Sequence, residues 1–293
     1  MSEPDPYRLD TRCVRRSFDR ASASYDRAAV LEADVRAVLL ERLDLTALEP
    51  RVVLDAGAGT GQGSRALTRR YPKALVLAAD SSRGMLRIAS RRAGWLRPFT
   101  RVLADAAALP LADASVDLIF SNLMLPWTEQ DAVFAEFRRV LAPRGLLTFT
   151  TLGPDTLEEM RSAWARVDAY TRVGRFSDMH DVGDALVRAG LAAPVLDVEH
   201  YTLHYRDVDA LVSDLRAVGN RNATAGRPRG LTSPRKLAAF AAAYEAFRRD
   251  GRLPATYEVV FGQAWAPAQI AARPDIGIPL EAVRRQLPGR RGP

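Results

Sequence analysis

The chain has 293 residues, of which 47% are hydrophobic and 26% are charged, a composition ordinary for a soluble globular protein. No apolar run approaches the roughly 20 residues that a membrane-spanning helix needs, and the single cysteine, Cys13, excludes a disulfide framework or a cysteine zinc cluster. The net charge of +7 is carried almost entirely by arginine and favours acidic partners in general. It does not favour nucleic acid, because no basic motif interleaved with aromatic residues accompanies it.

The N-terminal residues 1–6 are acidic and contain two prolines, so they do not resemble a signal peptide and we expect a cytoplasmic protein. Residues 12–43 then show the periodicity of two helices, joined near residues 22–25. In the second helix apolar side chains recur at spacings of three and four: Val30, Leu31, Val35, Val38, Leu39 and Leu43. We therefore expect a helical lid over residues 1–45, ahead of a main domain at residues 46–265.

Strands and helices alternate regularly from residue 51. Five short apolar runs have the length of strands: residues 51–55, 74–79, 100–104, 116–121 and 145–151. Three stretches have helical periodicity: residues 62–71, 82–91 and 130–141. This alternation predicts an α/β fold, a doubly wound parallel sheet with right-handed crossovers and helices on both faces, and thus three layers.

The alternation is interrupted after the fifth strand. Residues 154–167 are expected to form an inserted helix, and an arginine- and glycine-rich loop is expected at residues 219–232. Further helices are predicted at residues 181–189, 208–218 and 234–249, and strands at residues 195–205 and 257–265. From residue 266 to 293 the proline- and arginine-rich tail is expected to be disordered.

A glycine-rich loop connects the first strand to the following helix at residues 55–61, with the sequence DAGAGTG. Gly57, Gly59 and Gly61 let the backbone turn sharply and approach a ligand closely. Dinucleotide enzymes use a similar loop, but Gln62 stands where their third glycine would fall. Asp55 precedes the loop, and its carboxylate would repel a pyrophosphate while tolerating a cofactor that carries a cationic amino group.

Polar residues follow the next three strands, at the sheet edge where open α/β sheets bind ligands. Asp80 and Ser81 end the second strand, where a carboxylate can accept hydrogen bonds from two ribose hydroxyls. Asp105, with the backbone amide of Ala106, can bind the edge of an adenine ring. Asn122 ends the fourth strand, where backbone carbonyls can hold an amino group. Together with the glycine loop, these positions predict a site for S-adenosylmethionine (SAM).

Several longer segments resemble a known family. They are residues 18–30, 103–111, 121–127, 153–157 and 254–265, within a stretch from about residue 14 to residue 267. The chain resembles the class I SAM-dependent methyltransferases and, within them, the malonyl-acyl-carrier-protein O-methyltransferases of biotin biosynthesis. The resemblance implies seven strands with the last one antiparallel, SAM as methyl donor, and a malonyl thioester on an acyl carrier protein as acceptor.

The acceptor that the resemblance implies is a carboxylate, which is already ionised at neutral pH and needs no general base. Tyr25, in the lid, is then the first candidate for a catalytic side chain. An arginine could hold the carboxylate in a bidentate manner, and Arg161, Arg172 and Arg175 lie in the segment that normally covers the acceptor pocket in this fold. With three histidines and one cysteine, we expect no metal site.

The carrier protein that the resemblance implies is acidic, so we expect it to meet arginines on this chain. The candidates are Arg138, Arg139, Arg221, Arg227 and Arg229.

Three other functions remain open at this point. The first is methylation of another small carboxylate or of a phenol, for which His180 would be the base. The second is a role as an assembly factor or hydroxylase, because the carboxy-terminal segments also resemble a mitochondrial complex I assembly factor of the same fold. The third is RNA methylation.

Overall fold

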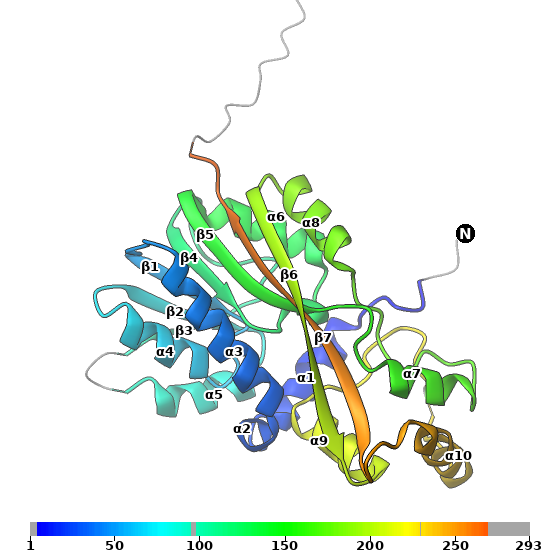
Figure 1. Cartoon of the computed structure of the whole chain (residues 1–293). Coiled ribbons are helices and arrows are strands. Elements are labelled where there is room, and N and C mark those ends of the chain that lie inside the picture. Colours follow the sequence, from blue (N-terminus) through cyan, green and yellow to red (C-terminus); the bar gives the residue numbers. More distant parts are fainter. Residues whose placement is uncertain (1–4, 95–97, 229, 269–293) are drawn as a thin grey trace, which may run out of the picture.

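A computed structural model describes residues 5–94, 98–228 and 230–268 of the chain (Figure 1). Seven strands form one sheet in the order β3-β2-β1-β4-β5-β7-β6. Their bounds are β1 (Val52–Ala56), β2 (Leu75–Asp80), β3 (Thr100–Leu103), β4 (Val116–Ser121), β5 (Leu141–Leu152), β6 (Ala192–Tyr205) and β7 (Leu253–Trp265). The first five strands are parallel, and β7 runs antiparallel to β5 and β6. The predicted class I methyltransferase sheet is therefore confirmed.

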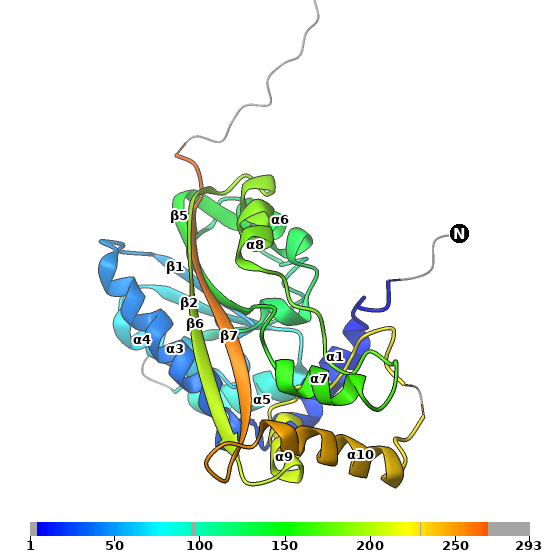
Figure 2. The same ribbon diagram turned by 45° about the vertical axis from the view of Figure 1, so that its right-hand side comes forward.

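Helices cover both faces of the sheet, because successive side chains of its central strands point to opposite sides. Val53 packs into the core under α3 (Val30–Arg42), α4 (Gln62–Arg70) and α5 (Arg83–Arg92), whereas Leu54 packs under α6 (Gln130–Val140) and α8 (Met179–Arg188). Figure 2 shows the sheet between α3 and α4 on one side and α6 and α8 on the other. The three predicted layers are present.

The N-terminal segment contains a short helix that the periodicity did not predict. Helix α1 (Thr11–Ala21) and helix α3 match the two expected helices, and α2 (Tyr25–Ala28) forms one turn at their junction. Helix α1 is held against α5, because the Asp19 carboxylate accepts hydrogen bonds from Ser82 Oγ at 2.7 Å and from the Gly84 backbone N–H at 2.8 Å. This places α1 and α2 beside the carboxyl ends of the parallel strands.

A cap follows β5 and is built on a long two-stranded ribbon. Strand β6 pairs with β7 as far as Leu253, while β5 pairs with β7 only from Val259 onward. The cap helices are α7 (Glu158–Ala165), α9 (Val208–Ala217) and α10 (Pro234–Tyr244). Elsewhere in the described residues, short 3-10 helices span Leu43–Leu45 and Leu125–Trp127, and one more follows α10 at Glu245–Phe247. Trp164 of α7 and Phe240 of α10 stack with ring centroids 4.2 Å apart, which joins these two helices.

Several predicted boundaries shift in the cap. The inserted helix begins at Glu158 rather than at residue 154, because Leu157 takes a φ of +55° and its N–H donates to Thr256 O of β7. Strand β7 begins at Leu253, since Pro254 lies where the ribbon has a partner on one side only, and there a proline removes no sheet hydrogen bond. Beyond residue 268, the tail predicted to be disordered lies outside the described residues. Within the described part of the chain, no helix is both long and apolar enough to span a bilayer.

Candidate cofactor and acceptor sites

The loop after β1 requires its glycines. Gly57, Gly59 and Gly61 all have a positive φ, between 53° and 81°. A Cβ on Gly57 would lie 2.3 Å from Met124 Cγ, so the close packing of the loop excludes any side chain there. A Cβ on Gly59 would meet nothing closer than 4.0 Å, so this glycine leaves open space in front of the loop.

That open space belongs to a cavity of about 460 Å³ at the carboxyl ends of the parallel strands. Most of the predicted cofactor residues line it: Gly57, Gly59, Asp80, Ser81, Asp105, Ala106 and Asn122. Tyr25 of the lid lines the same cavity. Residues from four strand ends and from the lid are thus brought to one place, as the sequence predicts.

Asp55 and Gly61 do not line the cavity. Asp55 is only 2% exposed, and its carboxylate accepts a hydrogen bond of 2.5 Å from Ser64 Oγ on α4. It lies beneath the loop, since a Cβ on Gly63 would come within 3.0 Å of it. Burial raises the pKa of Asp55 to about 6. Asp55 therefore connects the loop to α4 from behind, and its predicted contact with a cofactor amino group stays a prediction.

Asp80 combines a structural contact with free acceptor capacity. One carboxylate oxygen accepts from the Gly59 N–H at 2.8 Å, and the other from the Ser82 N–H at 2.7 Å. An ionised carboxylate has about four acceptor sites, so both oxygens can still accept from a ligand in the cavity. Burial raises the pKa of Asp80 to about 6.

The raised pKa values predict opposite effects of acid on stability and on ligand binding. In the folded protein the pKa of Asp55 and of Asp80 is about 6, whereas an aspartate in the unfolded chain has a pKa of about 3.9. As pH falls from about 7.5 to about 5.5, the free energy of unfolding of the ligand-free protein should therefore rise. The affinity for SAM should fall over the same window, because a protonated Asp80 loses acceptor capacity. Calorimetric melting and titration across this range test the pair, and a parallel change of both would contradict it.

The lid is fastened to the glycine loop by Asp26, the neighbour of Tyr25. Its carboxylate accepts hydrogen bonds from Thr60 Oγ1 at 2.6 Å, Gln62 Nε2 at 3.2 Å and Arg92 Nη2 at 2.7 Å. These donors come from the loop, from the start of α4 and from the end of α5. Asp26 therefore sets the position of Tyr25 over the cavity.

We expect Asp26→Asn to raise the KM for SAM by about tenfold, because an amide cannot replace the charge-assisted bond to Arg92. The melting temperature should change little, since the contact lies at the surface of the lid. Asp34→Asn, an exposed carboxylate on α3, is the matched control. An unchanged KM in the Asp26 variant would show that the lid holds its place without this contact.

The hydroxyl of Tyr25 is available to a ligand. Within the described residues it has no hydrogen-bond partner, and the side chain lines the cofactor cavity. Burial and the negative charges of Glu32 and Asp80 raise the pKa of Tyr25 well above its ordinary value. The hydroxyl therefore stays protonated at neutral pH and can donate a hydrogen bond.

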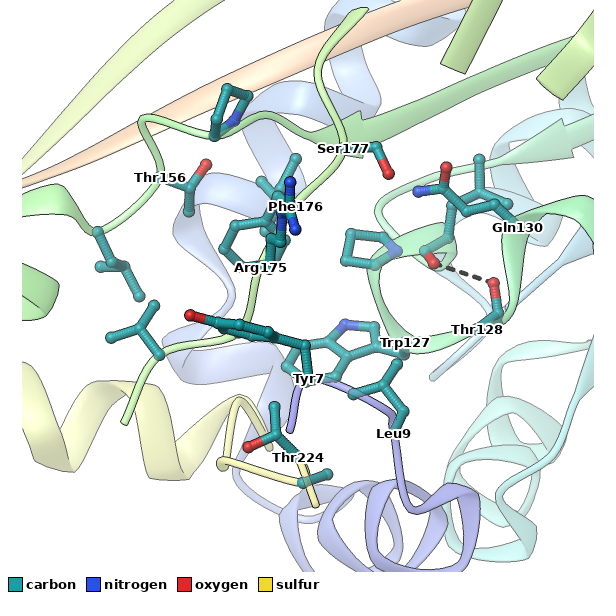
Figure 3. Close-up of a pocket in the computed structure, with 18 of the residues that line it drawn as sticks. Tyr7, Leu9, Trp127, Thr128, Gln130, Thr156, Arg175, Phe176, Ser177 and Thr224 are labelled. Atoms are coloured by element: carbon teal, nitrogen blue, oxygen red, sulfur yellow. Dashed lines mark hydrogen bonds between the residues drawn. The ribbon is translucent and has the colours of Figure 1, made fainter. Parts of the chain in front are cut away.

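A second cavity, of about 820 Å³, adjoins the first (Figure 3). Trp127, Thr128 and Glu129 line both cavities and form their common wall. Figure 3 shows the rings of Tyr7 and Trp127 facing this space, with Arg175, Phe176 and Thr156 around it. No pattern in the sequence of residues 5–9 predicts that they line a cavity. Tyr7 and Leu9 reach the cavity because their segment pairs with residues 223–226, with Leu9 opposite Thr224.

Of the three arginines predicted to hold the acceptor, one is used by the fold. Arg172 is 10% exposed, forms an ion pair of 2.6 Å with Asp168 and lies 4.1 Å from the Trp164 ring centroid. Hydrogen bonds from Arg172 hold the pKa of Asp168 down at about 2. Although Arg172 touches the larger cavity, its guanidinium supports α7 and is not free to clamp a carboxylate.

The other two arginines also line the larger cavity. Arg161 donates to Pro154 O at 3.1 Å and to Thr156 O at 3.0 Å, which fixes its guanidinium at the wall. Arg175 is exposed, and the described residues offer its side chain no acceptor. Of the three arginines predicted to hold the acceptor, Arg175 is therefore the one whose guanidinium is free to take a carboxylate ligand.

Some of the arginines predicted to meet a carrier protein are paired with acidic residues, and others are unpaired. Arg139 is bound to Glu136 and Asp113, and Arg227 to Asp10 and Thr224 O, so acidic neighbours already neutralise both. Arg138 and Arg221 have no side-chain partner in the described parts of the chain. Arg229 lies outside the described residues.

Two other groups that could serve alternative chemistry are not among the residues that line either cavity. His180 has a side chain that is 88% exposed, near Asp178 at the start of α8, and it lines neither cavity. Asp155, His200 and Glu258 could supply three ligand atoms within 4.8 Å of one another. Glu258, however, already accepts the Asp155 N–H at 2.8 Å, which fastens the loop after β5 to β7. Neither group faces a cavity in which a substrate could meet it.

The glycine loop, the carboxylates at the strand ends and the seven-stranded order define the class I SAM-dependent methyltransferase fold. A methyltransferase domain model matches residues 53–145. The YcgJ protein of Bacillus subtilis superposes with a TM-score of 0.56 at 17% identity, covering 78% of this chain and 97% of that one. A SAM-dependent methyltransferase of Thermotoga maritima gives 0.51 at 16% identity, covering 86% and 99%. A [4+2]-cyclase, SpnF, gives 0.52 at 20%, covering 80% and 82%, so the fold alone does not fix the reaction.

Sequence relatives are more specific. The malonyl-[acyl-carrier protein] O-methyltransferase of Methylovorus sp. is 51% identical over 92% of this chain and 94% of its own length. The proteins of that name from Halorhodospira halophila and Laribacter hongkongensis are 48% and 52% identical, covering 98% and 92% of this chain and 99% and 93% of their own lengths. The chain belongs to the malonyl-[acyl-carrier protein] O-methyltransferase family, which confirms the resemblance seen in the sequence.

Proposed function

We propose that this protein transfers a methyl group from SAM to the free carboxylate of a malonyl thioester carried by an acyl carrier protein, as a cytoplasmic enzyme of biotin biosynthesis. The observation that carries the proposal is the shared wall at Trp127–Glu129, which places a cofactor cavity and an arginine-bearing cavity next to each other. Two substrates bound in adjoining cavities can react directly.

The first cavity suits SAM by its donor set. The Asp80 carboxylate can accept from ribose hydroxyls, and the open space at Gly59 admits a ligand close to the backbone. Asp80 and Asp105 also bring negative charge to a ligand that carries two positive charges, on its amino group and its sulfonium. When bound, SAM supplies an electrophilic methyl group.

The second cavity suits a carboxylate acceptor. Arg175 has a free guanidinium and Arg161 a fixed one, and either can form two hydrogen bonds with a carboxylate. Tyr7, Leu9, Trp127 and Phe176 line the same space and give it an apolar surface beside these arginines. An ionised carboxylate is a sufficient nucleophile for methyl transfer, so no base such as His180, which lines neither cavity, is needed.

The direct test is to incubate the protein with SAM and malonyl carrier protein and to follow the mass of the carrier. We expect a gain of one methylene group on malonyl carrier protein and none on acetyl carrier protein, which lacks a free carboxylate. If the protein binds SAM but neither carrier gains mass, the acceptor is another molecule or the chain has a binding role, and the proposal is wrong.

Substitution can test which arginine binds the acceptor carboxylate. Arg175→Ala should raise the KM for malonyl carrier protein by about tenfold or more through loss of a charge-assisted pair, while the Kd for SAM stays the same. Arg166→Ala, just after α7, exposed and outside the lining of both cavities, is the control and should match the wild type. A normal KM for the Arg175 variant would transfer the role to Arg161.

A further inference from the structure

Two packed helices beside the cofactor cavity share an unusual charge pattern. Helix α1 carries Arg12, Arg16 and Arg20, and helix α5 carries Arg83, Arg87 and Arg91. The spacing of four keeps each set on one side of its helix, and all six side chains are exposed. We call these six residues the α1–α5 arginine face. The two helices lie side by side in both ribbon views (Figures 1 and 2).

Carboxylates on these helices do not neutralise this face. Asp19 is the only acidic residue on α1, and it is occupied with Ser82 and Gly84, while α5 has no acidic residue. Among the residues that the structure describes, no acceptor pairs with any of the six guanidinium groups. Like charges four residues apart destabilise a helix. Folding therefore does not account for the pattern, and an anionic partner would.

The face lies next to the entrances of both cavities. Arg12 belongs to the face and, with its neighbour Arg15, also lines the cofactor cavity. Arg8, just before α1 and likewise exposed, lines the acceptor cavity. A partner that rests on α1 is therefore adjacent to the space in which its attached group would react.

We propose that the α1–α5 arginine face is the docking surface for the acyl carrier protein, an inference that rests on the proposed function. The carrier is acidic, and the face supplies the opposite charge beside the acceptor cavity. This assignment replaces Arg139 and Arg227, whose charges the fold already neutralises. Complementary charges at such a surface act mainly on the association rate and on its dependence on salt.

The test compares two acceptors that carry the same reacting group. Malonyl carrier protein needs the docking surface, whereas a short malonyl thioester such as malonyl-N-acetylcysteamine does not. In Arg16→Glu/Arg20→Glu and in Arg83→Glu/Arg87→Glu, we expect kcat/KM for malonyl carrier protein at low salt to fall about tenfold or more. We expect kcat/KM for the short thioester to stay at the wild-type value. None of these four residues lines a cavity, and the reversals relieve repulsion, so the melting temperature should not fall.

The matched control is Arg166→Glu/Arg235→Glu, which reverses two exposed arginines on or beside α7 and α10, a second pair of packed helices. It should retain the wild-type value for both acceptors. A loss confined to this control would overturn the proposal and place the carrier on the cap. Unchanged kcat/KM for malonyl carrier protein in the α1 and α5 variants would also overturn the proposal. If those variants instead lost binding to anionic vesicles or to duplex DNA, the face would be assigned to that other anion.

The same assay separates the two proposals. If the wild type methylates neither acceptor, the proposed function and the docking surface both fail. If it methylates both and the face variants match the wild type on both, only the docking surface fails.

Discussion

Replacing Asp80 with alanine is expected to weaken SAM binding by more than tenfold. Each hydrogen bond from a ribose hydroxyl to the carboxylate contributes roughly 1.5–3 kcal/mol, and two such bonds are lost. The variant also leaves the Gly59 N–H without its acceptor, so the glycine loop itself loses a restraint. Titration calorimetry gives the Kd, and the melting temperature reports how much of the effect belongs to the loop.

A ribose analogue separates direct binding from loop support. The wild type should bind 2′-deoxy-S-adenosylhomocysteine more weakly than S-adenosylhomocysteine, whereas Asp80→Ala should bind the two almost equally. Asp131→Ala, an exposed carboxylate on α6, is the control. If Asp80→Ala still discriminated between the analogues as strongly as the wild type, Asp80 would support the loop without touching the ribose.

Tyr25→Phe is expected to lower turnover at least tenfold, which corresponds to about 1.4 kcal/mol of lost transition-state binding. The reason is that Tyr25 lines the cofactor cavity and that its hydroxyl has no hydrogen-bond partner among the described residues. The phenylalanine ring keeps the packing of the lid, so the melting temperature should hardly change. Single-turnover kinetics at saturating SAM measure the chemical step without the contribution of binding.

Tyr25→Ala completes this test, because it removes the ring as well. If the tyrosine only packs the lid, Tyr25→Phe should keep nearly full activity, while Tyr25→Ala should lose stability and activity together. That outcome would remove Tyr25 from the catalytic site and leave its neighbour Asp26 as the residue that fixes the lid.

The sheet could be predicted closely where the strands are buried on both faces. Strands β1, β2 and β4 begin and end within one residue of the expected positions, because each contains a run of at least three apolar residues followed by a polar residue. The β6–β7 ribbon was harder, since half of its length has solvent or a cap helix on one side. The last strand was predicted to begin at residue 257, whereas β7 begins at Leu253; Pro254 is tolerated within it because β7 has no neighbour there on the side away from β6.

The two cavities also differ in how far they could be predicted from the sequence. Residues at the ends of parallel strands meet at one edge of the sheet, so Asp80, Asp105 and Asn122 could be placed together from their positions in the sequence. The acceptor cavity depends on contacts between distant segments. Asp10 and Arg227, for example, are separated by 217 positions, and neither Tyr7 nor Thr224 lies in a pattern that announces a site.

This long-range pairing also orders events as the chain is synthesised. Every residue that lines the cofactor cavity has been added once Ala132 is in place. The acceptor cavity must wait, because Leu9 acquires its partner only when the ribosome reaches Thr224, and the last lining residue is Tyr257. Until then Tyr7 and Leu9 lack the segment with which they pair, so the residues for binding the methyl donor are all present before those for binding the acceptor.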